Sequence, residues 1–314
     1  MTGKPGTDTP AAADLPLVSV IMNGFNSARY LAEAVDTALA QTYPRWEIVF
    51  WDNCSDDESE SIMRGFGDPR IRYFRSPRRM PLAEGRNAAI ARSRGPWLAF
   101  LDCDDLWLPD KLARQVGRIG TDPEGEVGLI YGRTVSFSER GEEGETVYRY
   151  QGRSLPEGDI LRPLLLEGNL VPMVSAMVSR RAYHAVGGIP AHLTFAEDYW
   201  LFTAIAASFR AACIQDVCCR YRVHEGSATY RNKLASHVEA LEVLQNWGRL
   251  LDPIELRRRE SVYHTLIGIE KIRSGSGMLN GLAEIIARGS PQFLLRGAIS
   301  TGVRKFGRRR RPFA

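Results

Sequence analysis

The sequence predicts a doubly wound α/β fold, in which a mostly parallel sheet carries helices on both faces. From Leu17 to about Gly132, short apolar runs alternate with segments whose apolar residues recur at helical spacing. The run LVSVIM at 17–22 predicts a strand of the fully buried kind, which is typical of parallel strands that are covered on both faces. Ligands of such sheets bind beyond the carboxyl ends of the strands, so functional residues are expected there.

The expected strands of this half cover residues 17–22, 46–51, 71–74, 97–101 and 128–132. The first helix is expected at 27–41, with Asn26 or Ser27 as its N-cap. The second opens at Ser55, which forms a capping-box pattern with Glu58. A third covers 83–92, and a fourth opens at Pro109, a residue that suits a first helical turn.

Beyond Gly132 the pattern is mixed. The polar, glycine-rich stretch between Val135 and Gly152 predicts an exposed hairpin loop. A helix is expected at 159–167, and strands are expected at 174–178 and 217–223. From about Ser236 the chain is helical and polar, with breaks at 252–253 and 274–277.

These patterns divide the chain into a disordered lead-in, one α/β domain with two halves, a helical region and a basic tail. The boundaries are 1–16 for the lead-in, 17–235 for the α/β domain (17–132 and 133–235), 236–303 for the helical region and 304–314 for the tail.

The composition is ordinary for a globular protein, with 44% hydrophobic and 25% charged residues in 314. The net charge of +4 comes from the segment 304–311, which holds six basic residues and no acidic ones. Subtracting these six charges leaves −2 for the rest of the chain. The basic character therefore belongs to the tail, and nucleic-acid binding, if it occurred, would depend on Arg308 to Arg311.

Other classes are excluded by what the sequence lacks. The five cysteines are odd in number and lack the paired spacing of a zinc site, so we expect reduced thiols in a cytosolic protein. No apolar run approaches the roughly 18–20 residues that span a bilayer, and the first residues carry no apolar signal-peptide core.

Two of the expected strands end in carboxylates. The run WEIVFW leads into Asp52, followed by Asp56 and Asp57, and WLAFL leads into Asp102 and Asp104. In a parallel sheet both clusters emerge at the same edge, where a divalent cation shared with a diphosphate would offset their repulsion. The alternative is a pair of solvated turns, because Asp is common after strands.

Six segments taken together resemble the large family 2 of inverting glycosyltransferases, which have the GT-A fold. In chain order they are VSVIMNGFN, WEIVFWDNCSDDES, EGRNAAI, WLAFLDCDDLWLPDKL, FAEDYWL and YRVHEGS, and the resemblance runs from Leu17 to Thr229. The resemblance implies a bacterial enzyme that transfers a sugar from a nucleotide-diphosphate sugar, expected to be a UDP-sugar, to an acceptor hydroxyl. The Q-x-x-R-W motif of processive synthases is absent, which favours single transfer.

The resemblance also assigns residues around the donor. Asn23 and Phe25 would line the nucleotide cleft, and Asp52 would hydrogen-bond the nucleobase. Arg86 would lie near the phosphates, where a fixed, always-charged guanidinium suits an anion. Asp102 would face the donor ribose or sugar. On local pattern alone, Arg86 could equally be a helix-surface arginine.

The metal and the general base are assigned in the same way. Asp104 would bind Mn²⁺ or Mg²⁺ through the donor diphosphate, and His224 would reach the metal or the diphosphate. Asp198 would remove the acceptor proton, with Glu197 setting its position or charge. The structural alternatives are a hydrogen-bonded core histidine and acidic residues that favour a helix N-terminus.

The chain also departs from the family pattern. Asn23 and Gly24 replace the usual Pro-Thr after the first strand, and Asn53 replaces the second Asp of the usual double-Asp turn. Both changes lie near the expected base and ribose, so the choice of nucleotide is less well defined.

Other protein classes share parts of this pattern. A phosphatase of the D-x-D-x-T type is disfavoured because the fifth position is Leu106, and a nucleotidyltransferase is disfavoured because its glycine- and arginine-rich opening loop is missing. A non-catalytic sugar-nucleotide-binding protein of the same fold is the alternative that survives.

The partners expected from the family likeness are a nucleotide sugar and a carbohydrate or lipid-linked acceptor, with a role in surface polysaccharide or lipopolysaccharide synthesis. The segment 291–306 places Leu295, Ile299, Val303 and Phe306 on one helical face before the arginine run. Such a segment either docks on anionic lipid or packs on the protein. We expect a cytoplasmic protein, with peripheral membrane contact left open; the sequence does not indicate an oligomeric state.

Overall fold

The computed structural model describes residues 15–289, except 123, 147–149, 225, 227–231 and 275–277. The expected basic tail, the amphipathic segment 291–306 and most of the lead-in lie outside these residues. The chain forms two compact units, residues 1–164 with 169–225 and residues 165–168 with 226–314, which are described separately.

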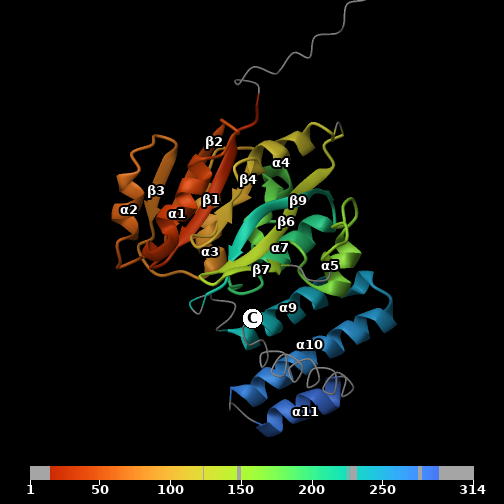
Figure 1. Ribbon diagram of the computed structural model, residues 1–314. Helices are drawn as coiled ribbons and strands as arrows, with labels where there is room; N and C mark the ends of the chain where they lie inside the picture. Colours follow the sequence, from red (N-terminus) through yellow and green to blue (C-terminus); the bar gives the residue numbers. More distant parts are fainter. Residues whose placement is uncertain are drawn as a thin grey trace, which may run out of the picture. The chain divides into compact units, whose positions relative to one another are not determined.

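The first unit is built on one curled sheet (Figure 1). Among the residues described, its strands run in the order β3-β2-β1-β4-β8-β6-β9-β5, and β7 pairs with β6. Their bounds are β1 Val18–Gly24, β2 Trp46–Asp52, β3 Ile71–Arg75, β4 Trp97–Phe100, β5 Leu106–Trp107, β6 Val127–Ser138, β7 Gly141–Glu145, β8 Met177–Ser179 and β9 Arg210–Arg222.

The predicted parallel sheet is confirmed for the N-terminal half. Strands β1 to β4 are mutually parallel, and β6 is parallel to β9, whereas β8 joins the two halves through antiparallel pairs to β4 and β6. All seven residues of β2 are buried, which explains why this strand does not alternate between apolar and polar residues.

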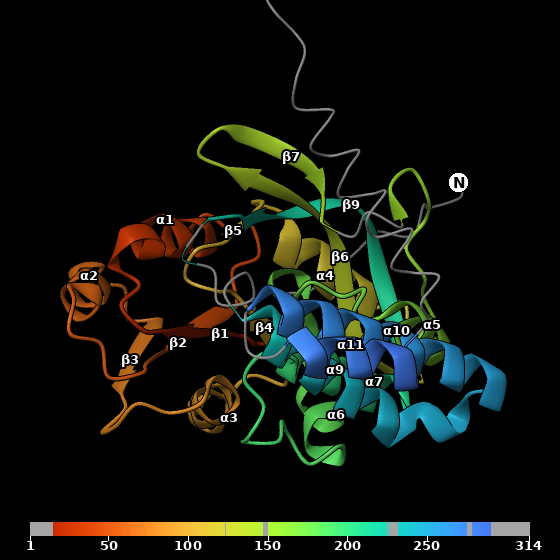
Figure 2. The same cartoon turned by 90° about the horizontal axis from the view of Figure 1, so that it is seen from below.

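Helices cover both faces of this sheet. Figure 2 shows α1 and α2 on one face of β1 to β3 and α3 on the opposite face. The helix bounds in the first unit are α1 Ala28–Leu39, α2 Ser59–Gly65, α3 Leu82–Arg92, α4 Lys111–Ile119, α6 Arg180–Ala185 and α7 Glu197–Ala206, and the residues of α5 Leu161–Glu167 are divided between the two units. The core beneath α1 includes Val20, Met22, Leu31, Ile48 and Phe50.

The predicted capping box at Ser55 is wrong. Helix α2 begins at Ser59 with Glu58 as its N-cap; the Glu58 side chain makes no capping hydrogen bond, and Asp57 Oδ1 accepts from Ser59 N at 3.0 Å. The Ser55 hydroxyl instead accepts a hydrogen bond from the backbone N–H of Asn26 at 3.0 Å. The Ser55 side chain therefore makes a tertiary hydrogen bond in place of the helix cap that the local pattern predicted.

Other boundaries moved in the second half of the sheet. The hairpin between Val135 and Gly152 exists, but its strands β6 and β7 continue into the stretch expected to be a loop. The strand expected at 174–178 lies at Met177–Ser179, preceded by the single-turn helix η2 (Met173–Ser175), and β9 begins seven residues earlier than expected. Strand β5 was not predicted, because a two-residue strand has no periodicity to detect.

The second unit consists of helices α9 (Lys233–Trp247), α10 (Pro253–Arg273) and α11 (Met278–Arg288), with a turn of 3-10 helix at Gly248–Leu250. Helices α10 and α11 approach closely at Gly268 and Gly281, where a β-carbon on either residue would meet the other's carbonyl oxygen at 2.7 or 2.6 Å. Over the part of the chain that the structure describes, no helix is both long and apolar enough to cross a membrane.

Candidate functional site

The loops that follow β1 and β2 are joined by their own side chains. Two backbone amides at the N-terminus of α1 donate to side chains that follow β2. Ala28 N donates to Asp57 Oδ2 at 2.9 Å, and Ser27 N donates to Ser59 Oγ at 3.1 Å. In many α/β folds these amides bind a phosphate. Here the protein's own side chains occupy them, so a diphosphate needs other partners.

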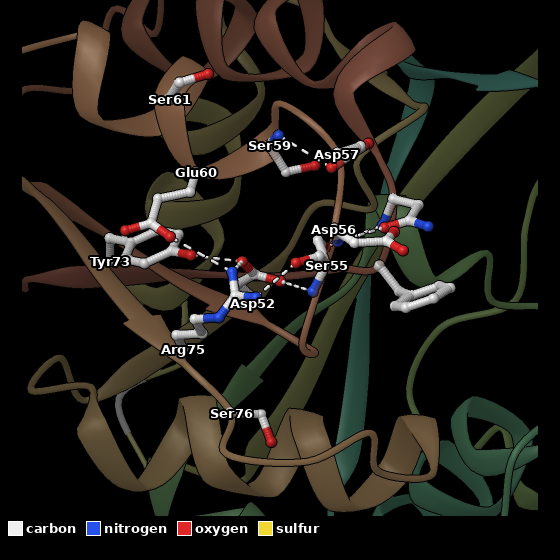
Figure 3. Close-up of polar contacts among 12 residues, drawn as sticks. Asp52, Ser55, Asp56, Asp57, Ser59, Glu60, Ser61, Tyr73, Arg75 and Ser76 are labelled. Carbon is white, nitrogen blue, oxygen red and sulfur yellow. Dashed lines mark hydrogen bonds and ion pairs between the residues drawn. The ribbon is translucent and has the colours of Figure 1, made fainter.

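Asp52, the last residue of β2, is fully buried. Figure 3 shows its carboxylate between Ser55, Tyr73 and Arg75. Oδ1 accepts from Ser55 N at 2.8 Å, and Oδ2 accepts from the Tyr73 hydroxyl and from Arg75 Nη1 at 3.1 Å. Because Asp52 has no exposed surface, the nucleobase contact expected from the sequence would require its present partners to move.

Asn53 holds the loop between β3 and α3. Its Nδ2 donates to Met80 O, and its Oδ1 accepts from Met80 N, both at 2.8 Å. An aspartate could not donate to the carbonyl, so this two-way bond gives a physical reason for asparagine at this position. The loop carries Arg79, whose guanidinium lies 3.4 Å from the centre of the Phe25 ring.

The ends of β1 and β4 are tied together by a buried thiol. Cys103 Sγ donates to Asn23 O at 3.1 Å, between the two aspartates of the D-x-D segment. The side chain of Asn23 contributes a buried Oδ1 that has no hydrogen-bond partner among the described residues. Asn23 therefore lies beside the D-x-D loop, next to the expected donor site.

Arg86 links the two halves of the first unit. This α3 residue is 4% exposed, and its Nη2 contacts Asp102 Oδ1 at 2.6 Å, while its Nη1 contacts Glu197 Oε1 at the start of α7. The sequence alternative of a helix-surface arginine is wrong. Because it is buried between these two carboxylates, Arg86 connects the D-x-D segment to the start of α7.

Asp198 follows Glu197 on α7, and each of its oxygens has a donor. Oδ1 accepts from Tyr199 N at 2.6 Å, and Oδ2 accepts from Asn169 Nδ2 at 2.8 Å. Burial raises the pKa of Asp198 to about 6, although Arg86 lowers it. The pKa of Glu197 is raised to about 8, mainly by burial and then by Asp198, against the lowering effect of Arg86.

Asp104 and His224 come together from β4 and β9. His224 Nε2 lies 2.8 Å from Asp104 Oδ2, with the two side chains 21% and 35% exposed. Arg222 fixes this arrangement, because its Nε donates to Asp104 O at 2.7 Å and its backbone N–H donates to Asp105 Oδ1 at 2.8 Å. Burial and the neighbouring Asp102 raise the pKa of Asp104, while His224 lowers it.

The donor atoms of this pair suit a divalent cation, because carboxylate oxygen and imidazole nitrogen are both ligands that Mn²⁺ accepts. Asp104 Oδ2 and His224 Nε2, 2.8 Å apart, form a hydrogen bond that a bound cation would replace. Within the described residues no group of three or more His, Cys, Asp or Glu side chains is placed to hold a metal.

Asn87, next to Arg86, fixes the loop at 187–189. Its Nδ2 donates to Ile189 O at 2.7 Å, and its Oδ1 accepts from the Tyr183 hydroxyl at 2.6 Å. Gly188 has φ +77°, and a β-carbon there would lie 2.9 Å from the Tyr183 oxygen, so glycine is required. One turn of α3 thus organises both the carboxylate cluster and the loop that leads to α7.

The structure brings Arg86, Asp102, Glu197 and Asp198 into one cluster and Asp104 and His224 into another. Phe25 and Asp52 lie with the loops after β1 and β2. Sequence reasoning missed Asn169, Arg222 and the role of Asn87; no local pattern marks the first, whereas the other two stand inside the segments EGRNAAI and YRVHEGS.

Comparison with known proteins defines the class. The family profile "Glycosyl transferase family 2" matches residues 19–187, more than half of the chain. The protein belongs to this family, and the GT-A fold and the resemblance seen in the sequence are thereby confirmed.

Individual relatives are similar over most of the chain. A glucosyltransferase of Escherichia coli named WfgD, UDP-Glc:alpha-D-GlcNAc-diphosphoundecaprenol beta-1,3-glucosyltransferase, is 25% identical over 260 residues, 81% of this chain and 94% of WfgD. An uncharacterised glycosyltransferase of Rickettsia felis is 28% identical over 257 residues, 81% of this chain. The chain spans 41% of that relative's length, and between 31% and 41% of two further relatives.

Solved structures show the same fold. Staphylococcus aureus TarS 1–349 in complex with UDP-GlcNAc superposes with a TM-score of 0.67 at 17% identity, over 87% of this chain and 79% of that one. The mannosyltransferase PcManGT of Pyrobaculum calidifontis, in complex with GDP-Man and Mn²⁺, gives 0.61 at 22% identity, over 96% and 84%.

Proposed function

We propose that the protein is a metal-dependent, inverting glycosyltransferase that transfers a hexosyl group from a UDP-sugar to an acceptor hydroxyl. The observation that carries the proposal is the cluster of Arg86, Asp102 and Asp198, from segments up to 112 positions apart, with Asp104 and His224 next to Asp102. The UDP-Glc in the name of WfgD and the UDP-GlcNAc bound to TarS support the choice of nucleotide.

In this mechanism Asp198 acts as the general base. Its pKa of about 6 leaves it ionised at neutral pH and still able to accept a proton. The acceptor oxygen attacks the anomeric carbon as Asp198 takes the hydroxyl proton, and the bond to the diphosphate breaks on the opposite face. One displacement of this kind inverts the anomeric configuration without a covalent enzyme intermediate.

The other site residues bind the nucleotide-sugar donor in this proposal. Asp102 faces the ribose or sugar, Arg86 adds positive charge near the phosphates, and Asn23 and Phe25 line the nucleotide. Asp104 and His224 would hold Mn²⁺ or Mg²⁺, which would supply charge that offsets the diphosphate leaving group. The role of Asp52 as a nucleobase contact stays a prediction, since its carboxylate already accepts hydrogen bonds from Ser55, Tyr73 and Arg75.

The acceptor is proposed to be a carbohydrate or a lipid-linked saccharide of surface polysaccharide or lipopolysaccharide synthesis, which the diphosphoundecaprenol-linked substrate in the name of WfgD supports. We place the protein in the cytoplasm, with peripheral membrane contact through the C-terminal basic segment at 291–311, which lies outside the described residues. Co-sedimentation with anionic vesicles, lost on deletion of Arg308 to Arg311, tests this contact.

The first experiment on function is calorimetric titration with UDP, GDP, dTDP and CDP, with and without Mn²⁺, on wild type and Asp104→Ala. Metal-dependent binding of one nucleotide, lost in the variant, supports the proposal. Turnover is then measured as nucleotide release from the matching sugar donor, where Asp198→Asn should be inactive. Binding without turnover favours the non-catalytic alternative, and binding of no nucleotide refutes both.

A further inference from the structure

Asn169 contacts the proposed base with a fixed orientation of its amide. It lies in the loop between α5 and η2, and its Oδ1 accepts from Val171 N at 3.1 Å. A backbone N–H can only donate, so the oxygen of Asn169 must face Val171 and the nitrogen must face Asp198. The bond from Nδ2 to Asp198 Oδ2 at 2.8 Å therefore has one possible direction.

The carboxylate of Asp198 is held from two sides. Asn169 binds Oδ2, and Tyr199 N binds Oδ1. Tyr199 is itself fixed, being buried, with its hydroxyl donating to Leu164 O at 2.9 Å. Each carboxylate oxygen can accept two hydrogen bonds, so each keeps a lone pair for a substrate hydroxyl.

The two adjacent carboxylates on α7 receive different partners. Arg86 contacts Glu197 and Asp102 directly, whereas the side chain bonded to Asp198 is the neutral amide of Asn169. A guanidinium in direct contact would hold a carboxylate strongly in its charged form and weaken it as a base. A neutral donor orients the carboxylate with a smaller effect on its proton affinity.

We propose that Asn169 is a positioning residue for the transfer reaction, which aims the Asp198 carboxylate at the acceptor hydroxyl and favours its ionised form. This inference rests on the proposed function, in which Asp198 is the general base. The pKa of Asp198 is raised by burial and by Asp102 and lowered by Arg86, by the Tyr199 amide and by Asn169. Two further titratable groups feel the charge of Asp198: Glu197, on the same helix, and Tyr221 of β9.

The test compares Asn169→Ala and Asn169→Asp with wild type. The aspartate keeps an acceptor for Val171 N, so it preserves the loop while removing the donor to Asp198. The full-length protein, labelled with ¹³C at aspartate carboxyls, is titrated by NMR without ligand, and Asp198→Asn identifies the resonance. Asn246→Ala, which removes an exposed amide bonded to Glu242 O, is the matched control.

In Asn169→Ala the midpoint of the Asp198 titration should rise by about one pH unit, because a hydrogen bond to a charged group is lost. In Asn169→Asp it should rise further, because a second carboxylate adds repulsion. The control should titrate as wild type. A midpoint in both Asn169 variants equal to that of wild type would overturn the inference.

Turnover gives an independent check, using whichever of UDP-glucose, UDP-GlcNAc and GDP-mannose releases nucleotide with the wild type. With the midpoint moved from about 6 to about 7, the loss of kcat/KM in Asn169→Ala should be about five times larger at pH 6 than at pH 8. An equal loss at both pH values would indicate a merely structural role and overturn the inference. If Asp198→Asn keeps wild-type turnover, the proposed function itself fails; an inactive Asp198→Asn with an unshifted Asn169→Ala removes only the inference.

Discussion

Substitution of Arg86 by methionine should destabilise the first unit strongly, because it leaves buried carboxylates without their cation. The Arg86 side chain is 4% exposed and Glu197 is 7% exposed, whereas Asp102 is 32% exposed. Methionine keeps much of the apolar volume of the arginine stem, so the change chiefly removes charge and hydrogen bonds. The pair with Glu197 therefore dominates the effect.

The magnitude follows from this burial. Removing one partner of a buried ion pair costs about 3–5 kcal/mol, because the other charge remains desolvated. The partly exposed Asp102 is screened by solvent and adds at most about 1 kcal/mol. Glu197, whose pKa is raised to about 8, can take up a proton at pH 7 when its cation is lost, so we expect Arg86→Met to lower the free energy of unfolding by less than this, about 2 kcal/mol. Arg86→Met combined with Glu197→Gln should recover most of this loss, since glutamine needs no cation.

Urea unfolding followed by tryptophan fluorescence measures this effect. Five of the six tryptophans lie in the same unit as Arg86, at positions 46, 51, 97, 107 and 200. The control is Arg64→Met, which breaks an exposed i,i+4 pair with Glu60 and should cost less than about 1 kcal/mol. A loss in Arg86→Met as small as in the control, or no recovery on adding Glu197→Gln, would refute the reasoning.

Three further predictions concern other parts of the first unit. Asn53→Asp should free the loop at Met80, because one of two backbone bonds becomes a repulsive contact, and amide exchange of residues 76–81 should accelerate at least tenfold. Asn87→Ala should lower the free energy of unfolding by about 2–3 kcal/mol in urea, since it removes bonds to Ile189 and Tyr183. Burial lowers the pKa of Lys111 from 10.5, so the unfolded chain binds more protons between its folded pKa and 10.5, and stability should rise with pH there by at most about 1.4 kcal/mol per unit. Lys111→Met should abolish that contribution; equal slopes in both proteins would contradict it.

The sequence determined much of the fold because its signals are local. A buried parallel strand is apolar at most positions, as at five of the seven in β2, and an α-helix repeats every 3.6 residues, so both can be read from short windows. The D-x-D segment after β4 could be located because the end of a parallel strand must face the ligand side of the sheet. Strand β5 was missed because two residues carry no period.

The hydrogen-bond partners of polar side chains could not be predicted from such short windows. Ser55 fitted a capping box, yet its hydroxyl accepts a hydrogen bond from the backbone N–H of Asn26, 29 positions away. Asp52 stands at the expected strand end, but Tyr73 and Arg75 from β3 occupy its carboxylate. In both cases the hydrogen-bond partner comes from a different segment of the chain that lies nearby in space.

The sequence by itself thus determined the family, the α/β sheet and the acidic residues gathered at one edge of it. Only the tertiary structure decided which partner each of those residues has. Arg86 meets Glu197 across 111 positions, His224 meets Asp104 across 120, and Asn169 meets Asp198 through a loop without a recognisable pattern. The physical reason is that periodicity depends on the local backbone, whereas a buried charge takes whichever partner the packing of distant elements places within hydrogen-bond reach.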